Sequence, residues 1–111
     1  MTTPEDPHHP VVDRPWTWKI VTLHFQIPTD GSESFIDLEL CRTAEQRRLR
    51  FFSPQGLEIE KGFPNAPGLV ILDVSKRGLD GLNIHVDDFE GGPGGIRFWA
   101  RAVQDISSSP R

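Results

Sequence analysis

Apolar and polar residues alternate with a period of two along most of the chain, and this is the spacing of β-strands rather than helices. The clearest example lies between residues 21 and 27, where four large apolar side chains are separated by polar ones. The apolar set is Val21, Leu23, Phe25 and Ile27. Side chains two apart on a strand share a face, so we predict that these four point into the interior.

Residues 36–41 and 46–52 show the same alternation, and their polar faces carry opposite charges. An antiparallel hairpin between them places Arg48 and Arg50 opposite the acids Asp37 and Glu39. Residues 42–50, "RTAEQRRLR", are also rich in good helix formers, so a helix there is the alternative.

Four further strands are predicted in the second half of the chain, separated by Gly- and Pro-containing turns. They cover residues 57–60, 69–74, 82–86 and 95–103. The second of these is apolar on both parities, which is typical of a central strand or one near a sheet crossing. The last is expected to bury Ile96, Phe98, Ala100 and Ala102. The fold class is therefore all-β, with about seven short, mostly antiparallel strands in a sandwich or partly open barrel.

The length of 111 residues suits a single domain. Residues 1–15 are rich in proline and charge with little to bury, and we expect them to form a disordered tail. The domain is predicted to span residues 16–106, followed by a second disordered tail at 107–111.

Charge and cysteine content narrow the class of protein. The net charge of -4 does not favour nucleic acid as a partner. The single cysteine, Cys41, cannot form an internal disulfide, and no secretory leader is apparent, so a cytoplasmic location is expected. The longest apolar run, residues 69–72, is far below the roughly 20 residues needed to cross a bilayer, and no membrane association is predicted.

The glycine-rich stretch "DDFEGGPGGIRFW" at residues 87–99 raises the question of a ligand site. It lacks the Lys-Ser/Thr pair of a phosphate loop and the glycine order of a dinucleotide fold. Asp87, Asp88 and Glu90, with a distant acid such as Asp73, would offer oxygens to calcium, but Asp87 and Asp88 on a strand would point to opposite faces and EF-hand spacing is absent. We interpret the stretch as a strand-to-strand connection with exposed acids, and predict no metal and no cofactor.

The tryptophans are the strongest candidates for a binding surface. Trp16 and Trp18 fall on the parity opposite Val21, and Trp99 lies between Arg97 and Arg101 on the outward parity of its strand. Tryptophan and arginine are enriched at interface hot spots and form cation-π contacts. The alternative is that the indole rings cover a second side of the core.

No residue set argues strongly for catalysis. His24 and His85 both have outward parity, and together with Asp87 they form a metal or acid-base site if their strands are neighbours. A metal- or small-ligand-dependent enzyme using these three residues is therefore retained as an alternative, although no catalytic residue is assigned.

The runs "RRLRFFSPQGLEIE" and "LNIHVDDFEGGPGGIRFWARAV" resemble, at the level of pattern, small all-β bacterial proteins of uncharacterised or toxin-immunity type. The resemblance implies a non-enzymatic domain that binds another protein, such as a toxin, and in that case the acids at 87, 88 and 90 face a basic partner. A homo-oligomeric structural domain that buries the aromatic face against a copy of itself is the remaining alternative. The sequence does not determine the oligomeric state.

Overall fold

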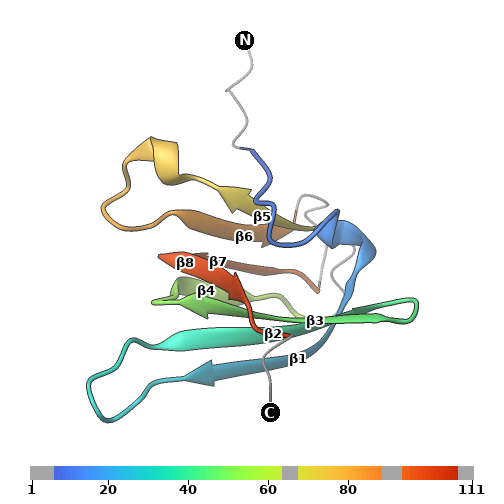
Figure 1. Ribbon diagram of the computed structural model, residues 1–111, viewed down its shortest axis with the longest axis horizontal. Helices are drawn as coiled ribbons and strands as arrows, with labels where there is room; N and C mark the ends of the chain where they lie inside the picture. The colour runs from blue at the N-terminus through green and yellow to red at the C-terminus, as the bar shows by residue number, and fades with distance from the viewer. Residues whose placement is uncertain (1–6, 64–67, 89–93, 108–111) are drawn as a thin grey trace.

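The computed structural model describes residues 7–63, 68–88 and 94–107, and these form eight strands and two short 3-10 helices (Figure 1). The strands are β1 (Lys19–Gln26), β2 (Phe35–Arg42), β3 (Glu45–Phe52), β4 (Gln55–Ile59), β5 (Leu69–Asp73), β6 (Ile84–Asp88), β7 (Ile96–Ala100) and β8 (Ala102–Asp105). The 3-10 helices are η1 (Pro15–Thr17) and η2 (Ser75–Arg77). No helix in the described ranges has the length and apolar character needed to cross a membrane.

The strands form two four-stranded antiparallel sheets. Sheet 1 has the order β1-β2-β3-β8 and sheet 2 the order β4-β7-β6-β5. They do not close into a barrel, and Figure 1 shows β5 and β6 at one end of the assembly and β1 at the other. The predicted all-β class is confirmed.

One hydrophobic core lies between the two sheets. It joins the inward-facing residues of β2 and β3 to those of β5, β6 and β7. The rings of Phe51 and Phe98 meet edge to face across it, with centroids 5.1 Å apart. The sheets are therefore the two layers of a sandwich that share a single interior.

The predicted hairpin is present as β2 and β3. Asp37 pairs with Arg50 and Glu39 with Arg48 on the outer face, while Ile36, Leu38 and Phe51 are buried on the inner one. The Arg50 guanidinium donates to both carboxylate oxygens of Asp37, at 2.8 and 2.9 Å. This geometry holds the register in which the two charged faces match.

The predicted orientation of the first strand is right for Leu23 and Phe25, which lie opposite inward residues of β2, but it is wrong before Thr22, where a β-bulge reverses the faces. Ile20 lies opposite Leu40, but Thr22 already lies opposite Glu39, so Val21 is an extra residue in β1. Ile20 and Leu23 consequently both lie opposite core residues of β2, although an even- and an odd-numbered residue would face opposite sides of a regular strand. Of the four residues expected in the interior, only Leu23 is half-buried; Val21, Phe25 and Ile27 are 51%, 40% and 71% exposed.

The last predicted strand is divided between the two sheets. β7 buries Ile96, Phe98 and Ala100 as expected, but the ladder ends at Ala100. After Arg101 the chain continues as β8 beside β3 in sheet 1, where Ala102 is only partly buried. Apolar and polar residues keep alternating where the chain passes from sheet 2 to sheet 1, so the sequence pattern does not mark the change of sheet.

The N-terminal segment, expected to be a tail up to residue 15, is packed against sheet 2 from Pro7 onward. The His9 amide donates to the Ile71 carbonyl and the Asp73 amide donates to the Pro7 carbonyl, both at 2.8 Å. Val12 belongs to the core cluster. β5, predicted to be either a central strand or one near a sheet crossing, is an edge strand of sheet 2 whose outer side is covered by residues 7–9. The expected tails at 1–6 and 108–111 lie outside the described residues.

Candidate protein-binding surface

The outer face of sheet 2 carries an aromatic stack built from two neighbouring strands. His85 of β6 and Trp99 of β7 are direct cross-strand partners, and both point away from the core because Val86, Phe98 and Ala100 take the inward positions. Their rings are nearly parallel, with an interplanar angle of 9° and centroids 3.8 Å apart. The Arg77 guanidinium lies 5.9 Å from the Trp99 ring. Trp99 is half-buried, so part of its ring is accessible.

A row of alternating charges runs beside this stack. Arg97 of β7 donates through Nε to Asp87 Oδ1 at 3.0 Å and through Nη1 to Glu58 Oε1 at 3.2 Å. The hydrogen bond to Asp87 is the main reason that the pKa of Arg97 is raised above its ordinary value. His85 Nε2 lies 3.8 Å from Asp87 Oδ2, which links the charged row to the aromatic pair. We call the surface formed by Glu58, His85, Asp87, Arg97 and Trp99 the Trp99 face.

Carboxylates outnumber basic groups at one end of the Trp99 face. A shallow depression there is lined by Glu58, Glu60, Asp87, Asp88 and Arg97. Asp87 and Glu58 bind the Arg97 guanidinium, and with Glu60 and Asp88 also in the lining, carboxyl groups are in excess there.

The three acids predicted as an exposed set do not share one environment. Asp87 belongs to the outer face, whereas Asp88 is only 7% exposed, because the two point to opposite sides of β6. The expected exposure of Asp88 is therefore wrong. A Cβ on Gly95 would lie 2.9 Å from Asp88 Oδ2, so the following loop needs glycine there. Glu90 lies outside the described residues.

Arg101 does not extend the Trp99 face, although the alternation predicted an Arg-Trp-Arg ladder. It lies where the chain leaves sheet 2, and both Nε and Nη2 donate to the carboxylate of Glu33, the latter at 2.8 Å. Hydrogen bonds from Arg101 and Ser53 lower the pKa of Glu33 to about 2. Arg101 also lies over the ring of Phe52, 5.5 Å from its centroid. It links sheet 1 to the loop before β2.

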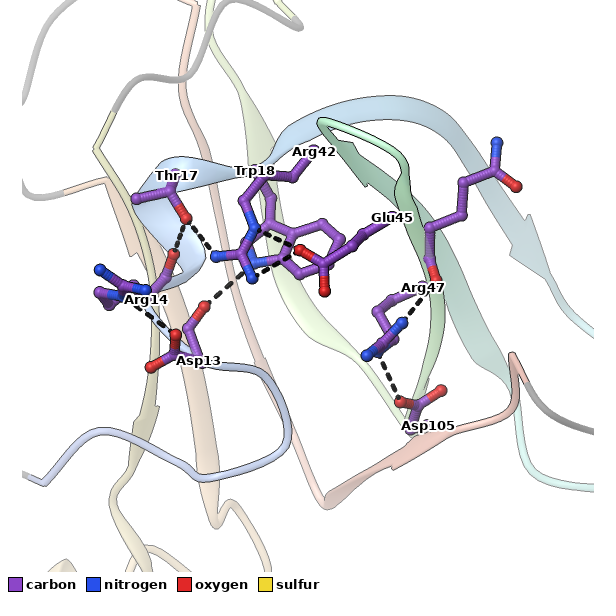
Figure 2. Close-up of polar contacts among 9 residues, drawn as sticks. Asp13, Arg14, Thr17, Trp18, Arg42, Glu45, Arg47 and Asp105 are labelled. Atoms are coloured by element: carbon purple, nitrogen blue, oxygen red, sulfur yellow. Dashed lines mark hydrogen bonds and ion pairs between the residues drawn. The ribbon is translucent and has the colours of Figure 1, made fainter.

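Trp18 is a core residue and offers no exposed ring. It is 4% exposed, and its indole N–H donates to the Asp13 carbonyl at 3.0 Å (Figure 2). The Arg42 guanidinium covers the ring at 4.2 Å and also contacts Glu45 and Thr17. The same bulge that turns Ile20 inward explains why the predicted outward orientation of Trp18 is wrong and why the alternative, an indole ring in the core, holds for this residue. These contacts join the N-terminal segment to sheet 1.

Trp16 is separate from the other two tryptophans. It belongs to η1, is half-buried, and its ring lies 5.4 Å from that of His8. The three indole rings predicted to share one face thus occupy three different environments, and of the three Trp99 is the one that lies on the outer face of a sheet.

The alternative catalytic set is not assembled. His24 lies on β1 in sheet 1, where its Nε2 is 3.0 Å from Gln26 Oε1, whereas His85 and Asp87 lie on β6 in sheet 2. Within the described ranges, no group of three or more His, Cys, Asp or Glu residues is arranged to hold a metal ion. Cys41 is a half-buried thiol on β2.

Sequence reasoning found Asp87, Arg97 and Trp99 but missed the partner of the indole ring. The outward parity of His85 was recognised, yet its stacking on Trp99 depends on β6 and β7 being aligned at that position. A signal was present: the glycine-rich connection between the two strands favours an antiparallel pair. No protein-family model matches the chain, and no curated protein or solved structure matches it either.

Proposed function

We propose that the protein is a non-enzymatic domain that binds another protein through the Trp99 face. The observation that carries the proposal is that the half-buried Trp99, stacked on His85, lies beside the Glu58-Arg97-Asp87 charge row on the outer face of sheet 2. Tryptophan and arginine supply much of the energy of protein interfaces, because each combines a large apolar area with directional hydrogen bonding.

The stack lowers the entropic cost of binding at this surface. The Trp99 ring is held on His85, and the Arg97 guanidinium is held by two carboxylates, so neither side chain has to be ordered when a partner arrives. Pre-organised side chains of this kind support binding without any rearrangement of the sheet.

A toxin-neutralising role is the narrower form of the proposal. It is supported by the resemblance of the sequence pattern to immunity-type proteins and by the acidic depression around Arg97, which complements a basic partner. A partner bound in this way loses affinity as the salt concentration rises, because the exposed acids Glu58 and Glu60 become screened.

The experiment uses two matched arginines. Arg97 and Arg50 each bind an aspartate across neighbouring strands, but on the outer faces of different sheets. A partner captured from cells is identified, purified and titrated against the wild-type protein and the two variants Arg97→Ala and Arg50→Ala. We expect Arg97→Ala to weaken binding about tenfold or more while Arg50→Ala leaves it unchanged. Equal effects of the two substitutions would overturn the assignment to the Trp99 face.

A further inference from the structure

Large apolar side chains are exposed mainly along one edge of the sandwich. Among the described residues, three of the exposed large apolar side chains lie on β1 or directly after it: Val21, Phe25 and Ile27. The other two are Ile59 of β4 and Leu79. β1 pairs with β2 on one side, and no described segment pairs with it on the other. Backbone groups on that side are available to a further strand.

The other three sheet edges each carry a feature that opposes pairing. β5 is covered by residues 7–9. β4 has a register irregularity and the ion-paired Glu58. β8 is only four residues long and carries Asp105, which lies 3.6 Å from Arg47. β1 has a bulge near its start, but from Thr22 to Gln26 its register with β2 is regular and it carries no acidic or basic residue except His24.

The apolar positions of this edge are symmetric in sequence. Val21 and Ile27 are equally distant from His24, and so are Leu23 and Phe25. When the strand is reversed about His24, apolar residues fall on apolar positions and Thr22 falls on Gln26. A second copy of the same strand therefore presents the matching pattern in antiparallel orientation.

We infer that β1 pairs with β1 of a second copy of this chain, antiparallel about a two-fold axis at His24. Leu23 of each copy then lies opposite Phe25 of the other in the regular part of the strand, and the bulge residue Val21 lies beside Ile27, which directly follows β1. Sheet 1 becomes one continuous sheet through the dimer, and the two open edges close each other. The inference goes beyond the proposed function, because it uses sheet 1 and leaves the Trp99 face free.

Charge is compatible with this pairing. Lys19 is the only lysine or arginine of β1 and it lies at the beginning of the strand. In the inferred register the two Lys19 residues lie at opposite ends of the paired segment, and the basic side chains that face each other are the two His24 imidazoles on the axis. The polar side chains of the strand are already engaged with their own sheet, since Thr22 Oγ1 donates to Glu39 Oε1 at 3.3 Å.

The test uses two single substitutions and their combination in the full chain. Val21→Lys and Ile27→Glu each place a charge beside an apolar side chain of the other copy, and we expect each to raise the dimer dissociation constant about tenfold. The double variant places the new ammonium of each copy beside the new carboxylate of the other, so we expect the wild-type dissociation constant to be largely restored. Analytical ultracentrifugation across a concentration series measures these constants.

Ile59→Lys is the matched control, because Ile59 is an exposed apolar residue on the edge strand of the other sheet. We expect this variant to dimerise like the wild type. Circular dichroism checks that each variant is folded, and hydrogen exchange of the β1 amides should slow as the wild-type concentration rises.

Three results would overturn the inference. The first is a wild-type protein that stays monomeric up to about 1 mM. The second is a dimer weakened by Ile59→Lys but by neither β1 substitution. The third is a dimer weakened by both β1 substitutions and not restored by their combination, which excludes the register about His24. Binding of a partner that depends on Arg97 is unaffected by any of these results.

Discussion

Two edge strands of the sandwich, β5 and β1, carry apolar residues, but a further segment of the described chain pairs with β5 and none pairs with the outer side of β1. β5 receives a further strand-like segment from its own chain, with hydrogen bonds from the His9 amide to Ile71 and from the Asp73 amide to Pro7. β1 receives no such segment from the described residues and exposes Phe25 and its neighbours. The difference follows from what each strand must bury.

β5 is apolar on both of its faces. Leu69, Val70 and Ile71 are all buried, and η1 and the N-terminal segment lie beside the strand. β1 has a polar outer parity formed by Thr22, His24 and Gln26, so one side of it tolerates water. A strand that is apolar on two faces needs a layer against each of them, and the N-terminal segment that supplies the second layer of β5 also pairs with its edge; a strand that is apolar on one face needs only the core.

The proline content of the covering segment suits an edge position. Proline has no amide proton and cannot sit in the middle of a sheet, but it is tolerated where one side of the backbone faces solvent. Pro7 contributes only its carbonyl, which accepts from the Asp73 amide. The composition that suggested a disordered tail is therefore equally suited to a segment that covers β5.

The largest expected effect is a loss of stability at the covered edge, β5, that does not occur at the open edge, β1. Val12→Asp places a carboxylate in the core cluster beneath the N-terminal segment, and we expect the free energy of unfolding to fall by about 3 kcal/mol. Val21→Asp puts the same group on the open edge, where we expect a change within about 0.5 kcal/mol for the monomer. Urea unfolding at low protein concentration measures both. Equal losses would mean that the two edges do not differ in burial.

A smaller loss in the free energy of unfolding is expected when Trp18, which binds the covering segment through Asp13, is substituted. Trp18→Phe removes the indole N–H that donates to the Asp13 carbonyl and weakens the contact with Arg42, so we expect a loss of about 1–2 kcal/mol. Faster hydrogen exchange at the Asp73 amide should accompany it, because that amide is bonded to the same segment.

Trp99→Phe is the control for this substitution, because its ring keeps an aromatic surface against His85. We expect it to cost less than about 1 kcal/mol and to leave the Asp73 amide protected. A larger cost for Trp99→Phe than for Trp18→Phe would contradict the assignment of Trp18 to the core and Trp99 to the outer face.

The sequence predicted those parts of the fold in which alternation runs without interruption. β2, β3, β6 and β7 all have the predicted inward residues, and the charges at Asp37 and Arg50 predicted their register. Alternation fails where a strand gains a residue or changes sheet. The bulge at Val21 has no glycine to mark it, and the crossing at Arg101 preserves the alternating pattern on both sides.

The sequence predicts those features of the candidate site that are set by one strand alone. Arg97 and Trp99 were placed outward from the pattern of β7 alone, and that orientation is present. The stack on His85 and the ion pair with Asp87 depend on how β6 aligns with β7, which local spacing does not fix. Trp18 was misplaced because one extra residue reverses the face of everything before it.

The smallest expected effect is the pH dependence that His9 gives to the attachment of the N-terminal segment to β5. His9 Nδ1 accepts a hydrogen bond from the Val11 amide at 3.1 Å, which requires the ring nitrogen to be unprotonated. Partial burial lowers the pKa of His9 from its ordinary value of 6.5, although the nearby Asp73 carboxylate acts in the opposite direction. The unfolded chain therefore binds a proton more readily than the folded one. This contribution to stability is complete above pH 6.5 and falls as the pH drops below it.

His9→Asn tests this dependence, because the asparagine side-chain oxygen can accept the same hydrogen bond without titrating. We expect wild-type exchange at the Ile71–Asp73 amides to accelerate between pH 7 and about 5.5, after correction for the intrinsic pH effect, and the variant to show little acceleration. His24→Asn, on the strand at the open edge, should retain the wild-type response. An identical response of His9→Asn and His24→Asn would show that the His9 ring does not hold the covering segment on β5, and that the backbone hydrogen bonds, Val12 and the Trp18–Asp13 hydrogen bond hold it instead.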